Sequence, residues 1–484
     1  MVEEFRTGFY PIESDRILVK NINQEASYPE GRSQEYLERQ AQRESNARSY
    51  PRRIPIAIRE AKGIYVTDTD GREYIDCLAG AGTLALGHNH PVAIAAMRQV
   101  LDINLPLHTL DITTPIKHQF VEELFASLPP AFARNAKIQF CGPTGADAVE
   151  AAVKLVKTAT GRRSMLSFHG GYHGMSHGAL SLTGNLAPKD KIANLMPGVH
   201  FLPYPYDYRC PFGIGGEMGH RLSSHYIEQV LNDPESGITP PAGMILELVQ
   251  GEGGAIPAPD RWVREIRRIT RDRGIPMIVD EVQTGWGRTG KLYAFEHAGI
   301  IPDVVLLSKA IGGSLPLSVV LYRQELDAWS PGAHTGTFRG NQMAMAAGLA
   351  TLRYIQEFGL ADRAKDMGAR LMGHLRQIQS EFPCMGDLRG RGLMIGVEIV
   401  NPEAEASDRG TYPGYPELAR RIQAECMRRG LILELGGRNG CVVRFLPPLI
   451  VTAEQIDRIG EIFHAAVRAS APQMSVQLAE VSGC

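Results

Sequence analysis

Between about residues 90 and 340, short apolar runs alternate with segments of helical pattern, and this alternation is the strongest constraint on the fold. The runs are residues 137–140, 165–168, 244–248, 277–279 and 304–307. Strands that are covered by helices on both faces read as continuous apolar runs, as is typical of parallel sheets. The pattern therefore predicts a mainly parallel α/β sheet that binds ligands at the carboxyl ends of its strands.

The rest of the chain divides around this segment. A helix is predicted near residues 33–47, and the Asp70-Gly71 turn predicts a hairpin. After about residue 345, helices, short β runs and a last helix from residue 453 indicate a separate α+β lobe. We expect four parts: an N-terminal arm (1–50), the N-terminal part of a small domain (51–90), a large domain (91–340) and a C-terminal small domain (341–484).

Composition excludes several classes of protein. A net charge of -2 over 484 residues gives no field for nucleic acid or for an anionic membrane. No apolar run approaches the roughly 18 residues of a membrane span, and the first residues do not read as a signal peptide. The seven cysteines and the histidines show no disulfide or metal-ligand spacing. We expect a cytoplasmic enzyme without a metal.

Lys309 directly follows an apolar run, in the segment LLSKAIGG of residues 306–313. Lysines are normally solvated, so a lysine at the end of a buried strand is unusual. Its position is explained if its amine forms a Schiff base, the bond by which lysines hold pyridoxal phosphate (PLP). Asp280 ends another such run, 29 residues earlier, which leaves room for one crossover to an adjacent strand. The acid and the lysine would then share one crevice.

A third signal is a turn that opens a helix. Residues 141–147, CGPTGAD, follow the run 137–140 and precede a helix with one apolar face. The free N–H groups and dipole of a helix start attract an anion, and Thr144 adds a hydroxyl. An ordinary helix start explains the segment about equally well, so its weight as a phosphate site comes from agreement with Asp280 and Lys309.

Together these residues carry a resemblance to the class III, or omega-type, PLP-dependent aminotransferases. The motifs are TGADAVE (144–150), GYHG (171–174), ELVQGEGG (247–254), DEVQTGWGRTG (280–290), SKA (308–310) and GTFRGN (336–341). Within that class, LPLHTLDITTP (105–115), CGPT (141–144) and YDYRCPFG (206–213) look like segments of the diaminobutyrate:2-oxoglutarate aminotransferases. The resemblance implies fold type I, with a seven-stranded type of sheet, and a homodimer whose active sites lie at the interface.

The resemblance also implies roles for single residues. Asp280 would pair with the pyridinium nitrogen, and Lys309 would hold the cofactor and then move a proton. The remaining cofactor-binding residues would be Thr144, Gly145, Ala146, Tyr172 (stacked on the ring), His173, Gln283 and, from the neighbouring subunit, Thr337. The plain alternatives are a core residue for Tyr172, turn residues for Gln283 and Thr337, and a structural acid at a strand end for Asp280.

Substrate recognition falls on Glu252 and Arg444. Arg444 stands in an otherwise apolar strand, VVRF (442–445), and suits a carboxylate, although a structural salt bridge is the plain alternative. The family implies that Glu252 covers Arg444 when a terminal amine binds and releases it for 2-oxoglutarate. Many relatives have an arginine at the position of Met175, and this arginine binds the distal carboxylate, so the sequence does not identify the residue that binds it here. Relatives often have a hydroxyl residue at the position of Ala146, which leaves phosphate binding to backbone N–H groups and Thr144.

The sequence therefore predicts transfer of the 4-amino group of L-2,4-diaminobutyrate to 2-oxoglutarate, giving L-aspartate 4-semialdehyde and L-glutamate. By resemblance, diaminobutyrate feeds siderophore, peptide or diaminopropane pathways. The alternatives in the same class are ornithine, acetylornithine and 4-aminobutyrate aminotransferases. An aminomutase would keep the same cofactor residues, whereas a regulatory protein on this fold would not need Lys309.

Overall fold

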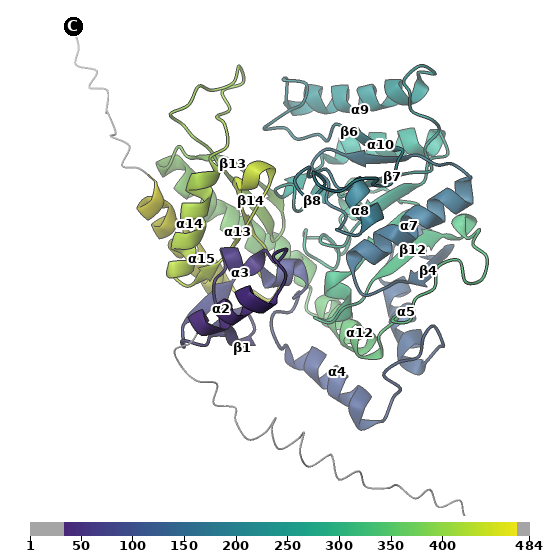
Figure 1. The fold of residues 1–484 in the computed structure, drawn as a ribbon, viewed down its shortest axis with the longest axis horizontal. Helices are drawn as coiled ribbons and strands as arrows, with labels where there is room; N and C mark the ends of the chain where they lie inside the picture. Colours follow the sequence, from purple (N-terminus) through teal and green to yellow (C-terminus); the bar gives the residue numbers. More distant parts are fainter. Residues whose placement is uncertain (1–32, 472–484) are drawn as a thin grey trace, which may run out of the picture. The chain divides into compact units, whose positions relative to one another are not determined.

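The structure is a computed structural model that describes residues 33–471 (Figure 1). The predicted N-terminal arm before residue 33 lies outside the described residues. Among the described residues two compact units are distinguished: residues 33–61 with 66–73, and residues 62–65 with 74–471. Both the predicted large domain and the predicted C-terminal domain belong to the second unit, and their exact limits stay a prediction.

The first unit contains the predicted helix and turn. Helix α2 (Ser33–Arg43) confirms the helix expected near its start and is followed by α3 (Tyr50–Arg53). Strands β1 (Ile58–Lys62) and β2 (Tyr65–Asp68) come next. Gly71 forms the turn with a φ of 80°, a left-handed conformation that favours glycine.

The second unit is built on a seven-stranded sheet. Its strands are β4 (Ala136–Phe140), β5 (Met165–Phe168), β6 (Val199–Leu202), β7 (Gly243–Leu246), β10 (Met277–Asp280), β11 (Val304–Leu307) and β12 (Val319–Arg323). They lie in the order β4-β12-β11-β10-β7-β5-β6, and only β12 runs antiparallel to its neighbours. The mainly parallel sheet is therefore confirmed, with β6 and β12 added to the predicted runs.

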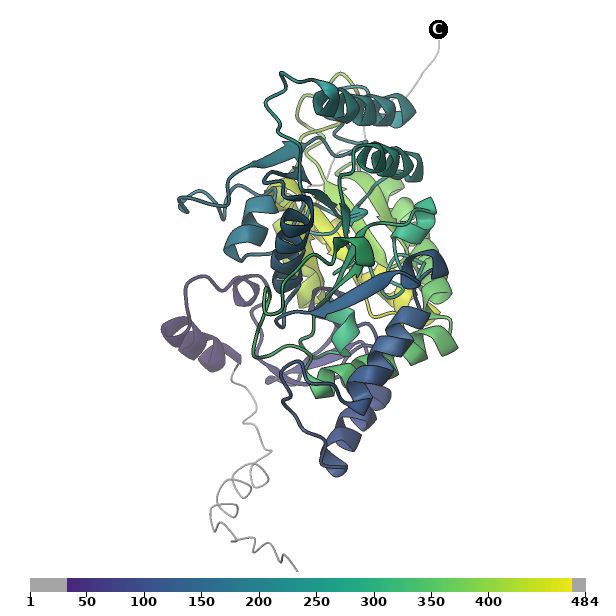
Figure 2. The same ribbon diagram turned by 90° about the vertical axis from the view of Figure 1, so that its right-hand side faces the viewer.

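Helices α7 (Gly145–Thr160), α8 (His177–Leu182) and α10 (Asp260–Asp272) contact the sheet directly, and other helices pack against helices of this layer. In α7, Val149, Ala152, Val153 and Val156 are buried, as their spacing predicts. Helices α9 (Gly216–Asn232) and α10 lie side by side (Figures 1 and 2). The others are α4 (Pro91–Asp102), α5 (Pro115–Ala126), α6 (Pro130–Ala133), α11 (Phe295–Ala298) and α12 (Gln342–Glu357).

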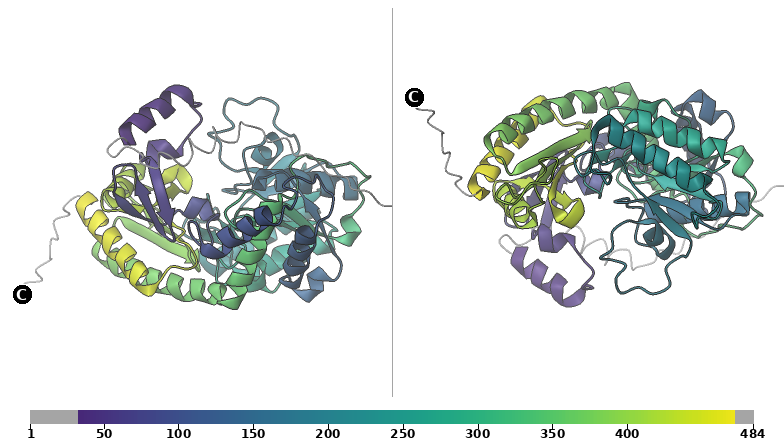
Figure 3. Two further views of the ribbon diagram at one scale, coloured as in Figure 1. Left: turned by 90° about the horizontal axis from the view of Figure 1, so that it is seen from below. Right: turned by 90° about the horizontal axis from the view of Figure 1, so that it is seen from above.

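The C-terminal part forms a second, antiparallel sheet. Its strands, β13 (Met385–Arg391), β14 (Met394–Ile399), β16 (Glu434–Gly436) and β17 (Val442–Phe445), lie in the order β13-β14-β17-β16. Helices α13 (Leu360–Glu381) and α15 (Ala453–Ser470) line one side of it (Figure 3), and α14 (Pro416–Arg428) packs against α15. The predicted last helix from residue 453 is confirmed. Strand β15 (Leu431–Ile432) pairs in parallel with the end of β3 (Glu73–Asp76) at Ile75 and Asp76.

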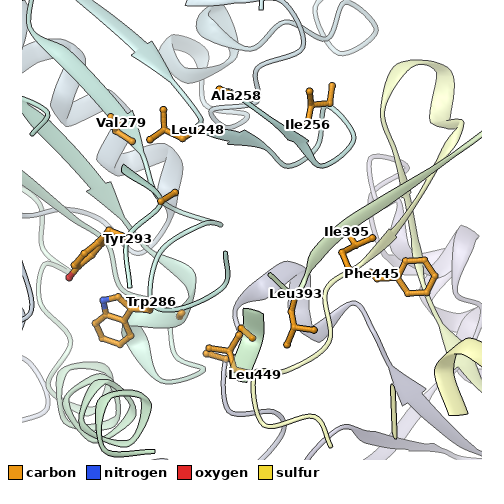
Figure 4. Packing of buried hydrophobic residues seen from close by; sticks show 14 of the residues in the cluster. Leu248, Ile256, Ala258, Val279, Trp286, Tyr293, Leu393, Ile395, Phe445 and Leu449 are labelled. Atoms are coloured by element: carbon orange, nitrogen blue, oxygen red, sulfur yellow. The ribbon is translucent and has the colours of Figure 1, made fainter. Parts of the chain in front are cut away.

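One connected hydrophobic core joins the two sheets. Val279 and Leu248, near the ends of large-sheet strands, belong to the same buried cluster as Ile395 and Phe445 of the smaller sheet (Figure 4). This shared core fixes β16 and β17 relative to the carboxyl ends of β10 and β11. Among the described residues, no helix is long and apolar enough to cross a membrane.

Candidate active site

Lys309 lies just beyond β11, at the start of a short 3-10 helix (Lys309–Gly312). Its φ is 51°, in the left-handed region, which costs a non-glycine residue about 1–2 kcal/mol. Ser308 anchors this turn by donating its hydroxyl to the Leu317 carbonyl at 2.9 Å. Burial lowers the pKa of the Lys309 amine, and the charge of Asp280 acts in the opposite direction. Such strain is typical of functional sites, because the surrounding structure must hold it in place.

Asp280 ends the neighbouring strand and is held by His173. In the parallel pair of β10 and β11, Asp280 lies opposite Leu306, so Lys309 follows on the adjacent strand end, as the sequence predicts. His173 Nδ1 lies 2.8 Å from Asp280 Oδ2, and Val282 N–H donates to Asp280 Oδ1 at 3.1 Å. Both Asp280 and His173 are buried. The carboxylate is thus fixed in orientation.

Glu247 is a second buried acid at this edge, which the sequence analysis did not single out as a site residue. It directly follows β7, and its two carboxylate oxygens accept the N–H groups of Tyr172 and Gly251, each at 2.8 Å. Burial, together with the charge of Asp280, raises the pKa of Glu247 to about 7, although the charge of His173 and the two N–H donors act in the opposite direction. The signal was present, because an acid after a buried run is the pattern that identified Asp280.

Tyr172 is tied to Glu247 through its N–H group, and Gln283 follows Asp280 by three residues, so both belong to this edge of the sheet. Burial raises the pKa of the Tyr172 phenol, and the charges of Glu252, Glu247, Glu434 and Asp280 add to the effect. Gln283 Nε2 donates to the Ala81 carbonyl at 2.8 Å, and its Oε1 is buried without a hydrogen-bond partner among residues 33–471. A Cβ at Gly251 would lie 2.0 Å from that oxygen, so the glycine lets the loop approach Gln283.

The predicted phosphate loop opens α7 and packs against Val282, two residues after Asp280. Thr144 donates its N–H and its hydroxyl to Asp147 Oδ2, at 2.9 and 2.7 Å, as in an ordinary helix cap. A Cβ at Gly145 would lie 2.9 Å from Val282, and one at Gly174 would lie 2.6 Å from the Ala146 side chain. The loop thus packs closely against the segments that carry Asp280 and His173.

Thr337 lies in an exposed loop. Its carbonyl accepts a hydrogen bond from His108 Nε2 at 2.9 Å, and the ring of His108 meets the exposed Phe338 edge-on. The predicted role of Thr337 concerns the cofactor of a second subunit, so it stays a prediction.

Arg444 is buried between two carboxylates. Its Nη2 lies 2.9 Å from Glu252 Oε2, which brings the predicted pair together. The same nitrogen pairs with Glu434, which lies directly opposite Arg444 in the antiparallel pair of β16 and β17. The exposed fractions of the side chains are 2% for Arg444, 6% for Glu434 and 39% for Glu252. The sequence did not predict Glu434 as a site residue, although an acid within the apolar run 431–435 indicates a buried charge that needs a partner. Met175 is exposed.

This group of residues fits PLP. It offers an amine with a lowered pKa, a buried carboxylate at Asp280 and a helix start at Thr144. It also contains two buried polar atoms, His173 Nε2 and Gln283 Oε1, without hydrogen-bond partners in the described part of the chain. These residues follow the carboxyl ends of strands or pack against them, and this is where α/β sheets bind their ligands. Fold and site together define a PLP-dependent enzyme of fold type I.

Comparison with known proteins gives the family. Residues 46–467 match the family Aminotransferase class-III, and the chain belongs to this family of PLP-dependent transaminases. A diaminobutyrate–2-oxoglutarate aminotransferase of Rhizobium meliloti is 60% identical over 431 residues, covering 89% of this chain and 92% of the relative. One of Haemophilus influenzae is 52% identical over 435 residues, covering 90% and 95%.

Solved structures agree with this assignment. An (S)-enantioselective omega-transaminase of Thermomicrobium roseum matches with a TM-score of 0.81 and 27% identity, over 92% of this chain and all of that chain (100%). A PLP-bound amine transaminase of an uncultivated Pseudomonas species matches with a TM-score of 0.78 and 27% identity, over 89% and 98%.

Proposed function

We propose that this enzyme transfers the 4-amino group of L-2,4-diaminobutyrate to 2-oxoglutarate, giving L-aspartate 4-semialdehyde and L-glutamate in a reversible reaction. The observation that carries the proposal is the 60% identity to a relative of that name over 89% of the chain. The buried Arg444 supports it, because a guanidinium beside a releasable carboxylate suits a site that receives an amine and a dicarboxylate in turn.

PLP supplies an aldehyde for the incoming amine and a ring that stabilises negative charge on the substrate carbon. Lys309 would hold it and then carry the proton between substrate and cofactor, and a lowered pKa favours the neutral amine that this role needs. Asp280 would hold the ring nitrogen through a carboxylate that His173 keeps in place. Glu247 would fix the Tyr172 backbone, so that the ring of Tyr172 excludes water from the cofactor.

The other cofactor contacts follow from the loops around the crevice. The α7 start, with Gly145, Ala146 and Thr144, would bind the phosphate mainly through backbone N–H groups, since the Thr144 hydroxyl is engaged with Asp147. Gln283 would reach the phenolic oxygen of the cofactor.

Substrate exchange would use the difference between the two acids at Arg444. Glu252 is partly exposed and sits in the turn between β8 (Val249–Gln250) and β9 (Ile256–Pro257), so its side chain can leave. When it does, Arg444 can accept the α-carboxylate of 2-oxoglutarate as a bidentate partner.

A homodimer with shared active sites completes the proposal. Five exposed apolar side chains lie in residues 101–112, namely Leu101, Ile103, Leu107, Leu110 and Ile112. Phe338 is also exposed. Asp111 joins this stretch to the Phe338 loop through an ion pair with Arg339 at 2.6 Å. Such a patch is typical of a subunit interface, and it would carry Thr337 to the cofactor of the partner. A cytoplasmic location and a role in siderophore biosynthesis stay predictions from the sequence.

A panel of amino donors tests the function. Purified enzyme with PLP and 2-oxoglutarate should form glutamate fastest, by kcat/KM, from L-2,4-diaminobutyrate. A higher kcat/KM with ornithine, acetylornithine or 4-aminobutyrate would replace the proposal by one of those activities. Product formed from the amine alone, with no 2-oxoacid and in multiple turnovers, would indicate an aminomutase. The Lys309→Ala variant serves as the inactive control.

A further inference from the structure

The ion pair that the family implies at Arg444 is a cluster of three charges. Glu434 and Arg444 face each other across β16 and β17, so the sheet register itself holds them together. A Cβ at Gly436 would lie 2.8 Å from Arg444 Nε, which means that the arginine lies flat across β16 beside Glu434. With Glu252 in place, two carboxylates surround one guanidinium, and the cluster carries one net negative charge.

The two acids differ in freedom. Glu434 is buried within the sheet, and removing a carboxylate from a buried arginine is costly, so it remains a fixed partner. Glu252 is half-buried, and its carbonyl accepts the Gly437 N–H at 2.8 Å, so its backbone is tied while its side chain can turn away. When Glu252 leaves, Arg444 and Glu434 form a neutral pair instead of a bare positive charge.

The charge of this cluster acts on the reacting amine. The charges of both Arg444 and Glu434 act on the pKa of Lys309, and those of Glu252 and Glu434 act on the pKa of Tyr172. A donor that presents its terminal amine at Lys309 therefore brings its other end into the field of these three residues. A negative cluster attracts an ammonium group there and gives no such advantage to a donor that lacks one.

We propose that Glu434 is a specificity-determining residue: with Glu252 it leaves one net negative charge around Arg444, and this charge selects amino donors that carry a second ammonium group. The inference rests on the proposed function, since the α-ammonium of diaminobutyrate is that second group. It also gives a reason for reversible exchange, because 2-oxoglutarate and glutamate bind to a neutral pair and are released more easily than from an unpaired guanidinium.

Two donors of equal length isolate the effect. L-2,4-Diaminobutyrate and 4-aminobutyrate differ only by the α-amino group. Glu434→Gln should lower the ratio of their kcat/KM values in the first half-reaction at least about tenfold, because one charge is lost. Glu434→Asp, which keeps the charge, should retain most of the wild-type ratio. If 4-aminobutyrate is not turned over, its competitive inhibition constant against diaminobutyrate replaces its kcat/KM.

A matched control separates specificity from stability. Glu398 is a buried glutamate of the same sheet, on β14, and pairs with Arg389 at 2.8 Å and with Arg209 at 2.5 Å. Glu398→Gln should leave the donor ratio unchanged even if it lowers the melting temperature. A wild-type ratio in Glu434→Gln, or an equal fall in the Glu398→Gln control, would overturn the proposal.

A double variant covers the case in which Glu434→Gln does not fold. Glu434→Gln with Arg444→Gln removes both members of the buried pair, so no unpaired arginine remains, and Glu252 alone keeps the net charge at minus one. The donor ratio should then stay near the wild-type value, and a tenfold fall would contradict the charge argument. If ornithine proves to be the donor, the proposed function fails, but ornithine against 5-aminopentanoate repeats the same test.

Discussion

His173 Nδ1 lies 2.8 Å from Asp280 Oδ2, and both side chains are buried. The histidine comes from the loop between β5 and α8 and the aspartate from the end of β10, so the contact joins two parts of the chain that are 107 residues apart. Because the carboxylate cannot turn freely, its charge is held in one orientation at the end of β10. The first predictions concern what this fixed charge and the neighbouring amine do.

Lys309→Ala should abolish multiple turnovers, because attachment of PLP and proton transfer both need the amine. The fold should survive, since the alanine removes a side chain and leaves the strand intact. Circular dichroism and non-covalent PLP binding check the structure, and glutamate formation checks activity. Sustained turnover in the variant would remove Lys309 from its assigned role.

Asp280→Asn should keep PLP bound but slow transamination by about a thousandfold, because asparagine cannot hold a proton on the ring by charge. A charge pair at about 4 Å is worth roughly 4 kcal/mol at an effective dielectric near 20. Asp303→Asn is the control, since Asp303 is paired with Arg267 at the other end of β11. A near wild-type rate in Asp280→Asn, measured in single turnovers, would make Asp280 a structural residue.

Glu252→Ala should slow the half-reaction with diaminobutyrate, because Arg444 loses one of its two carboxylate partners. The α-amine of the substrate should then react in place of the 4-amine in a larger fraction of turnovers. The shift should be partial, since Glu434 still pairs with Arg444. Arg444→Ala should do the reverse and impair 2-oxoglutarate more than the diamine. Stopped-flow measurements of each half-reaction decide this, and equal losses in both halves would leave the pair as an ordinary salt bridge.

Glu247 should make the folded enzyme less stable as pH rises. Its pKa is raised from 4.5 to about 7 in the folded state, so the folded protein binds more protons than the unfolded chain between these values. The free energy of unfolding therefore falls as pH rises through this window, and the loss is complete above about pH 7. Glu247→Gln should reduce that fall by at most a few kcal/mol, measured by urea unfolding at several pH values. If the free energy of unfolding of Glu247→Gln fell with pH as steeply as that of the wild type, the assignment to Glu247 would be wrong. Glu122→Gln, at an exposed position, is the control.

Ile112→Asp should produce a monomer with little activity, because it places a charge in the exposed apolar stretch proposed as the subunit interface. Light scattering with size-exclusion chromatography measures the mass of the particle. Leu186→Asp, at an exposed position outside this stretch, should leave it unchanged. A wild-type mass and activity for Ile112→Asp would place the interface elsewhere.

Much of this site follows from local sequence pattern. Short apolar runs give most of these strands, and parallel strands end at one edge of a sheet, so the pattern alone brings Asp280 and Lys309 to the same edge. The helix that starts at Gly145 is likewise set by its apolar spacing and its cap. The strand β12 was missed although it is apolar, because its antiparallel insertion between β4 and β11 depends on pairing and not on its own residues.

Only the tertiary structure decided which polar groups are buried together. Glu247 meets the Tyr172 N–H across 75 residues, and Gln283 meets Ala81 across 202, and no periodicity links such positions. Glu434 faces Arg444 because of strand register, and a shift by one residue would turn its carboxylate to the other side of the sheet. The sequence by itself determined most strands of the large sheet, the lysine and the family, since these depend on neighbours along the chain. The charge around Arg444 depends on register and loop closure, which exist only in the folded molecule.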